Sequence, residues 1–210
     1  MNRVFMPTVN IVDDDEALRK ALSRVLRFQG WSVKCFESSE AFLAGCDPDA
    51  SGCLLLDVQL PGLDGLALQQ RLHDAGIRLP IIFMSGHGDI PMSVRALKAG
   101  ARDFLSKPVT AAQLLEAVSQ AVAWQADARQ TIDEQHELRR RYDALSDRER
   151  QVLLELCRGR LNKQIAAELG IVEQTVKFHR ARIMERMQAA TVADLMYQAA
   201  RLALLSKQSA

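Results

Sequence analysis

The first half of the chain alternates short apolar runs with amphipathic helical patterns. The runs predict five strands, at Thr8–Val12, Ser32–Phe36, Cys53–Leu56, Ile81–Met84 and Asp103–Ser106. Segments such as CLLL and IIFM lack polar alternation, which is typical of strands buried on both faces. Between the first two strands, apolar residues recur at helical spacing from Leu18 to Leu26. This succession predicts an α/β fold, with a five-stranded doubly wound parallel sheet covered by helices on both faces.

The pattern becomes helical from Thr110, and neither Gly nor Pro occurs again before Gly159. Residues 124–144 are mostly polar, with sparse apolar positions, which indicates an exposed helix that continues the last helix of the first domain. We therefore expect a first domain over 1–123, a helical linker over 124–144 and a second domain over 145–210. A surface helix of one larger domain is the less favoured alternative.

The second domain is predicted to be small and all-α, with four helices. Ser146 and Glu149 have the spacing of a capping box, and Gly159 is placed to end the first of these helices. Further helices are expected over 162–169, over 173–187 after a break at Gly170, and over about 191–205.

Composition excludes several classes of protein. No apolar run approaches the roughly 20 residues that span a bilayer, and the N-terminus lacks a signal-peptide pattern. We therefore expect a cytoplasmic protein without a membrane partner. The four cysteines have neither CxxC spacing nor nearby paired histidines, so free thiols are expected.

The net charge of +1 is unevenly distributed along the chain. Residues 1–123 carry 12 Lys and Arg against 14 Asp and Glu, whereas residues 145–210 carry 11 against 7. A basic C-terminal domain is compatible with a polyanionic partner, although solvated helices often carry such a surplus.

Reactive residues follow four of the predicted strands. Asp13 and Asp14 come after the first strand, Asp57 after the third, Ser85 after the fourth and Lys107 after the fifth. The carboxyl ends of parallel strands meet at one edge of the sheet, where ligands bind. The topology therefore predicts that these carboxylates, a hydroxyl and an ammonium group lie in one crevice.

Clustered carboxylates repel unless a proton or a cation relieves them, and Mg²⁺ prefers oxygen ligands. A carboxylate can also act as a nucleophile that accepts a phosphoryl group. Asp57 is the natural candidate because LLLD ends a buried central strand. Individually these residues allow plainer interpretations, such as Asp13, Asp14 and Asp15 charging a helix N-terminus. Their joint placement favours a site.

The motifs IVDDD, LLLDVQLPGLDG, FMSGHGD and ARDFLSKP, in this order over residues 8 to about 123, resemble the receiver domain of two-component response regulators. The resemblance implies that a sensor histidine kinase phosphorylates Asp57. It implies Mg²⁺ held by Asp13, Asp14, Asp57 and the main-chain carbonyl of Gln59, with Asp14 the more direct ligand of the acidic pair.

The same resemblance assigns a switch pair, Ser85 and Phe104, and a phosphate-sensing lysine, Lys107. It also implies a cis bond before Pro108, which is a minority outcome for X–Pro bonds in general. His87, between two glycines, is interpreted as a loop residue.

The C-terminal domain offers the parts of a helix-turn-helix: a helix, a Gly-containing turn and a basic second helix. On the second helix Gln174, Lys177, Phe178 and Ala181 share one face, while Val176, Ile183 and Met187 share another. Arg180, Arg182 and Arg186 flank the first face, where they are expected to reach DNA phosphates.

The segment LSDRERQVLLELCRGRLNKQIAAELGIVEQTVKFHRARIMERM resembles the LuxR-type DNA-binding domain. Together with the receiver pattern, the chain resembles FixJ/NarL-type response regulators, a group that includes regulators of aromatic-hydrocarbon breakdown. Two departures from the pattern concern DNA preference. Val172 stands at the start of the second helix, where relatives carry Ser or Thr, and Ala181 replaces a polar base reader of some relatives.

These patterns together predict a transcriptional activator rather than an enzyme. Phosphorylation of Asp57 is expected to favour a homodimer that binds promoter DNA, with RNA polymerase as a further partner. One alternative is an aspartate-nucleophile phosphatase of the haloacid dehalogenase type with a helical interaction domain. Such an enzyme would carry a second Asp two residues after the nucleophile, and that position is Gln59. Another alternative is a helical domain that binds protein or RNA.

Overall fold

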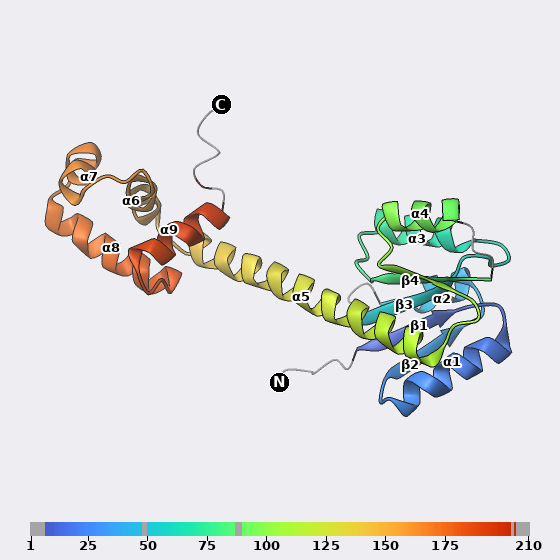
Figure 1. Ribbon diagram of the computed structural model, residues 1–210. Coiled ribbons are helices and arrows are strands. Elements are labelled where there is room, and N and C mark those ends of the chain that lie inside the picture. Colours follow the sequence, from blue (N-terminus) through green and yellow to red (C-terminus); the bar gives the residue numbers. More distant parts are fainter. Residues whose placement is uncertain (1–6, 48–49, 87–89, 203, 205–210) are drawn as a thin grey trace. The chain divides into compact units, whose positions relative to one another are not determined.

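The chain folds into two compact units, Met1–Ala128 and Arg129–Ala210, each with its own hydrophobic core (Figure 1). The computed structural model describes residues 7–47, 50–86, 90–202 and 204.

The N-terminal unit is built on a parallel sheet in the order β2-β1-β3-β4-β5. Its strands are β1 (Thr8–Val12), β2 (Ser32–Phe36), β3 (Gly52–Asp57), β4 (Ile81–Ser85) and β5 (Asp103–Ser106). All residues of β3 and β4 are buried, as their continuous apolar runs indicate. The prediction of five parallel strands is confirmed, and β3 extends one residue further at each end than expected.

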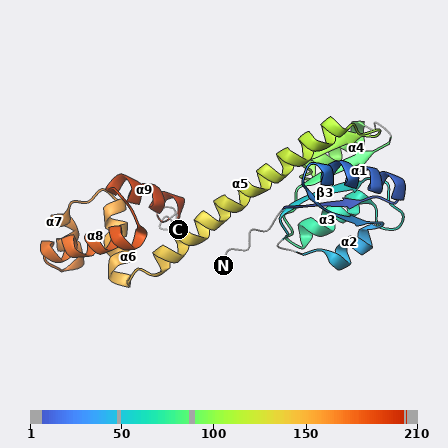
Figure 2. The same ribbon diagram turned by 90° about the horizontal axis from the view of Figure 1, so that it is seen from below.

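Helices cover both faces of this sheet (Figures 1 and 2). The helices of this unit, including one that runs on beyond it, are α1 (Glu16–Phe28), α2 (Ser39–Gly45), α3 (Gly65–Asp74), α4 (Ile90–Lys98) and α5 (Ala111–Asp143). One core cluster lies between the sheet and the helices α1 and α5, and a second lies between the sheet and α2, α3 and α4. The doubly wound architecture predicted from the sequence is therefore confirmed.

The start of α1 fixes the acidic segment that precedes it. Asp15 is the N-cap, and its carboxylate accepts hydrogen bonds from the main-chain N–H groups of Ala17 and Leu18 at 2.8 and 3.1 Å. Of the three consecutive aspartates, Asp15 therefore caps α1, whereas Asp13 directly follows the last residue of β1.

A buried glutamine attaches α5 to the segment where β3 begins, at the amino end of the parallel strands. Gln125 is 4% exposed; its side-chain oxygen accepts a hydrogen bond from Gly52 N at 2.6 Å, and its amide nitrogen donates to Ala50 O at 3.2 Å. These bonds satisfy main-chain groups at the N-terminal end of β3 and fix the position of α5 against the sheet.

The C-terminal unit contains α6 (Asp147–Cys157), α7 (Asn162–Leu169), α8 (Glu173–Met187) and α9 (Val192–Arg201). Helix α8 packs against the other three, and Val176, Ile183 and Met187 on it are fully buried. The predicted four helices are confirmed. The last one ends at Arg201, and Leu205, where it was expected to end, lies outside the described residues.

No helix in the described part of the chain is both long and apolar enough to span a membrane.

The glutamate that completes the capping box of α6 also pairs with an arginine near the end of α8. The Glu149 carboxylate accepts the main-chain N–H of Ser146 at 2.8 Å, and Ser146 Oγ accepts the N–H of Glu149 at 3.3 Å, as the spacing predicts. The same carboxylate pairs with Arg186 at 2.8 Å, and Arg186 also donates to Ala144 O at 3.0 Å. Burial alone would raise the pKa of Glu149, but the Ser146 bonds and the Arg186 charge outweigh it and lower the pKa.

We predict that Glu149→Ala destabilises the C-terminal unit by about 1–3 kcal/mol, because a cap and an ion pair with a buried carboxylate are both lost. Glu149→Gln keeps a side chain that can complete the cap and should cost less. Native-state hydrogen exchange of amides in α6 and α8 measures both effects. As a control, Asp147→Ala removes an exposed side chain from the same turn and should change little.

The cost of Glu149→Gln should depend on pH. A pKa lowered by folding stabilises the folded state above the ordinary value of 4.5, and this contribution is lost as the pH falls below it. The difference between wild type and Glu149→Gln should therefore shrink on acidification. A constant difference between pH 7 and pH 3 would contradict the assigned ion pair.

Candidate functional site

The predicted acidic residues meet at the carboxyl edge of the sheet. Asp13 follows β1 directly and Asp57 ends β3, and these two strands are neighbours with Val12 opposite Leu56. The chain passes from β1 through α1 to β2 on one side of β1, and then from β2 through α2 to β3 on the other side. This reversal of direction opens a crevice at this edge.

Three carboxyl groups lie close together there. One ligand oxygen from each of Asp13, Asp14 and Asp57 can be chosen so that all lie within 4.8 Å of one another. Asp13 is fully buried and Asp57 is 6% exposed, whereas Asp14 is exposed to solvent. The site therefore has a buried floor and one carboxylate that faces water.

Lys107 joins the two buried carboxylates. Its ammonium nitrogen lies 2.7 Å from Asp13 Oδ2 and 2.6 Å from Asp57 Oδ2, although 94 and 50 residues separate it from them along the chain. The prediction that β5 delivers this lysine to the acidic crevice agrees with these contacts.

The pKa values at the site follow from burial and from the sharing of one cation. Burial raises the pKa of Asp13, and the Lys107 ammonium only partly opposes this because it also serves Asp57. For Lys107, burial alone would lower the pKa, but two carboxylate partners outweigh burial and raise it. Lys107 therefore stays charged, and this one ammonium group serves a cluster of three carboxyl groups.

Main-chain groups hold one oxygen of each buried carboxylate. Asp13 Oδ1 accepts the N–H of Asp15 at 2.9 Å, and Asp57 Oδ1 accepts the N–H of Gln59 at 3.0 Å. The guanidinium of Arg19 donates to the main-chain oxygen of Asp13 at 2.5 Å. Sequence reasoning did not single out Arg19; its position in the first turns of the helix after Asp13 was the available signal.

Gly65 allows α3 to approach the end of β3. A Cβ atom at this position would lie 2.3 Å from the main-chain oxygen of Asp57 and 3.1 Å from the Phe83 ring. Its main-chain N–H also donates to Val58 O at 3.1 Å. No role for this glycine is predicted from the sequence, although it lies within the motif LLLDVQLPGLDG.

The two residues predicted as a switch pair lie on β4 and β5. Ser85 ends β4, is 2% exposed, and accepts the N–H of Lys107 on its main-chain oxygen at 2.7 Å. Phe104 is half-buried and packs against the core cluster beneath α2, α3 and α4. The Lys107–Pro108 bond is cis, as the resemblance implies. His87 lies outside the described residues.

The arrangement suits a hard divalent cation and a carboxylate nucleophile. All the candidate ligands are oxygens, three carboxyl groups face one ammonium group, and Asp14 leaves the site open to water. The residues therefore fit Mg²⁺.

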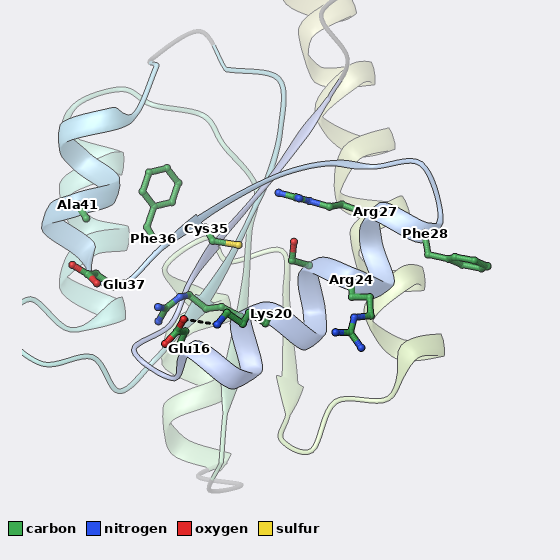
Figure 3. A pocket seen from close by; sticks show the side chains of 11 residues that line it. Glu16, Lys20, Arg24, Arg27, Phe28, Cys35, Phe36, Glu37 and Ala41 are labelled. Carbon is green, nitrogen blue, oxygen red and sulfur yellow. Dashed lines mark ion pairs between the residues drawn. The ribbon is translucent and has the colours of Figure 1, made fainter.

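A separate concavity of about 970 Å³ lies between α1 and the edge strand β2. Figure 3 shows side chains from α1, including Arg24 and Arg27, opposite Cys35 and Phe36 of β2, with the Glu16–Lys20 ion pair at 2.6 Å. None of the three clustered carboxylates lines it. This cleft is open and is distinct from the acidic site.

The C-terminal unit presents a polar surface on α8, opposite its buried stripe. Gln174, Lys177, Phe178 and Ala181 are exposed on this face, which we call the reading face, and the flanking Arg182 is exposed beside it. The Arg182 guanidinium lies over the Phe178 ring, 5.1 Å from its centroid. The reading face thus carries both cationic and apolar groups.

The flanking arginines differ in what they contact. Arg180 is half-buried and donates to Asn162 Oδ1 at 2.6 Å, which ties α8 to the start of α7. Arg186, which is also expected to reach phosphates, donates to Glu149 Oε2 and to Ala144 O. Its contacts therefore give it a role within the fold.

Comparison with known families matches both units. A model described as the response regulator receiver domain matches residues 9–119, and one described as bacterial regulatory proteins of the luxR family matches residues 143–199. The chain belongs to the response regulators that carry a LuxR-type DNA-binding domain, and it is a phosphorylation-activated transcriptional regulator. The phosphatase alternative is not supported.

Individual relatives agree with this assignment. The response regulator protein TodT of Pseudomonas putida is 46% identical over 194 residues, which are 92% of this chain and 86% of TodT. The transcriptional regulatory protein FixJ of Rhizobium meliloti is 41% identical over 192 residues, 91% of this chain and 94% of FixJ. A solved structure of the response regulator StyR has a TM-score of 0.86 at 43% identity, covering 93% of this chain and 99% of that one.

The predicted membership of the FixJ/NarL-type regulators is thereby confirmed. Receiver domains bind Mg²⁺ at an acidic pocket, and the two domains imply a histidine kinase and promoter DNA as partners.

Proposed function

We propose that Asp57 is the phosphoacceptor of this regulator and that a sensor histidine kinase supplies the phosphoryl group. The observation that carries the proposal is the bridging of Asp13 and Asp57 by Lys107, with Asp14 within reach of both carboxylates. Asp57 is the central member of this set, because it ends a fully buried strand and holds the N–H of Gln59.

In the proposed reaction a carboxylate oxygen of Asp57 forms a bond to phosphorus while the bond between phosphorus and the kinase histidine breaks. The histidine nitrogen keeps the electron pair and takes up a proton from solvent. Lys107, already within 2.6 Å of Asp57, would orient and neutralise a phosphoryl oxygen. Mg²⁺, held by Asp13, Asp14, Asp57 and the main-chain oxygen of Gln59, would supply further positive charge as the phosphoryl group transfers.

Phosphorylation would then act through β4 and β5. The Ser85 hydroxyl would move to a phosphoryl oxygen, and Phe104, now half-buried, would turn into the space that this opens. The result is a shift between two populations of the same fold, with a changed surface on α4 and β5.

The changed surface would favour a homodimer of receiver domains. The helical linker over 124–144, which continues the receiver helix, would connect each receiver to its DNA-binding domain. Dimerisation would bring two reading faces to half-sites about one helical turn apart, roughly 10 bp centre to centre. On promoter DNA the dimer would act as an activator that contacts RNA polymerase in the cytoplasm.

On DNA, Gln174, Lys177, Phe178 and Ala181 would face base edges, because they occupy the exposed side of α8. Arg180 and Arg182 would contact phosphates, which position the protein without reading sequence. Arg180 already bridges α7 and α8, so it would link the DNA backbone to both helices.

We predict that Asp57→Asn abolishes labelling by acetyl phosphate or by the kinase, because the nucleophilic oxygen is lost. Radiolabel retained on the full-length protein in Mg²⁺ measures this. Asp15→Asn is the matched control, since asparagine also caps α1 and labelling should remain near wild type. Wild-type labelling of Asp57→Asn would refute the assignment. Release of phosphate over many turnovers without lasting label would favour an enzyme instead.

For DNA, Lys177→Ala is expected to change base preference, whereas Arg180→Ala should weaken binding to all sequences and flatten its salt dependence. Competition gel shifts at two salt concentrations separate the two effects. Lys34→Ala removes an equal charge from β2 of the receiver and serves as the control. If Lys177→Ala leaves both affinity and preference unchanged, the reading face is assigned wrongly.

A further inference from the structure

The four helices of the DNA-binding unit do not begin in the same way. Helices α6 and α9 start at Ser146 and Thr191, whose hydroxyl oxygens accept N–H groups of Glu149 and Asp194 at 3.3 and 3.1 Å. Helices α7 and α8 start at Leu161 and Val172, which have no side-chain cap. The two helices of the helix-turn-helix, α7 and α8, therefore lack the polar N-cap side chains that α6 and α9 have.

Both apolar caps are also exposed. Leu161 is 70% exposed and Val172 is 67% exposed, so neither side chain gains much from the core. A Ser or Thr at such a position would satisfy an N–H group of the first turn and stabilise the helix. Stability of the folded unit therefore does not account for either residue.

The two positions differ in where they would lie on DNA. The second helix of a helix-turn-helix enters the major groove and contacts bases through its N-terminal residues, whereas the first helix crosses the backbone. Val172 begins the second helix, and the same helix exposes Phe178, which is 55% exposed, on its reading face. The N-terminal part of α8 thus offers two exposed apolar side chains.

An exposed valine can recognise only an apolar feature, since it has no group that hydrogen-bonds. In the major groove the apolar feature of the base edges is the C5-methyl group of thymine. We propose that Val172 is a specificity residue that contacts a thymine methyl group in each half-site. This inference rests on the proposed DNA-binding role of α8 and adds a residue and a chemistry of recognition to it.

The test uses the full-length protein, phosphorylated with acetyl phosphate, and a duplex that it selects from a random pool. Each thymine of that duplex is replaced in turn by deoxyuridine, which removes only the methyl group. Wild type is expected to bind about fourfold more weakly when the contacted methyl is missing, given the transfer free energy of one such group. Val172→Ser is expected to bind the two duplexes with equal affinity.

Leu161→Ser is the matched control. It also replaces an exposed apolar cap by serine, and Gln164 already accepts the main-chain N–H at position 161 at 2.9 Å. Both serine variants should raise the unfolding temperature of the C-terminal unit by roughly 4 °C, which shows that each is folded. Leu161→Ser should keep the wild-type dependence on thymine methyl groups.

The outcomes separate this inference from the function on which it rests. Wild type that binds a selected duplex but tolerates deoxyuridine at every position overturns the role of Val172 alone. The same follows if Val172→Ser keeps the wild-type deoxyuridine profile. It also follows if the variant binds both duplexes more weakly by the same factor, so that the wild-type preference for the methylated duplex remains. Wild type that selects no duplex overturns the DNA-reading role of α8 as well.

Discussion

Buried carboxylates repel one another unless a cation lies between them, and this constraint governs the N-terminal unit. Asp13 and Asp57 share the ammonium group of Lys107, so one residue relieves both carboxylates. Three carboxyl groups lie around this single ammonium group, which is why the site suits a divalent cation. Removing or redistributing charge here therefore changes interactions on β1, β3 and β5 together.

The sheet order places the residues of the proposed switch on adjacent strands. Because β1 and β3 are neighbours, and β4 and β5 follow at the same edge, Asp57, Ser85 and Lys107 lie along adjacent strands. The main-chain bond from Lys107 to Ser85 couples the last two strands at this edge. In the proposed switch, this is the route by which phosphorylation of Asp57 would change the surface of α4 and β5. The C-terminal unit has a hydrophobic core of its own.

The sheet and the short helices could be predicted because their signals are local and periodic. Continuous apolar runs identified β3 and β4, and the Ser146–Glu149 spacing identified the start of α6. The acidic site followed from topology, because parallel strands bring their carboxyl ends together. Features that depend on tertiary distance were not predictable in this way.

Arg19, Arg186 and Gly65 illustrate that second class. The Arg19 guanidinium reaches six residues back to Asp13 O, and the Arg186 guanidinium bonds to Glu149, which is 37 residues away. Sequence spacing fixes neither partner. The need for glycine at position 65 arises from one close approach to Asp57 O. The lack of a polar cap at Val172 was visible in the sequence, but its exposure came only from the structure.

A crystal structure of the full-length protein with Mg²⁺ and beryllofluoride, a phosphoryl mimic, tests the central claim most directly. The account predicts beryllofluoride joined to one Asp57 oxygen, Mg²⁺ held by Asp13, Asp14, Asp57 and Gln59 O, and Lys107 donating to a fluoride. Beryllofluoride on another residue, or Mg²⁺ bound away from these carboxylates, would contradict it.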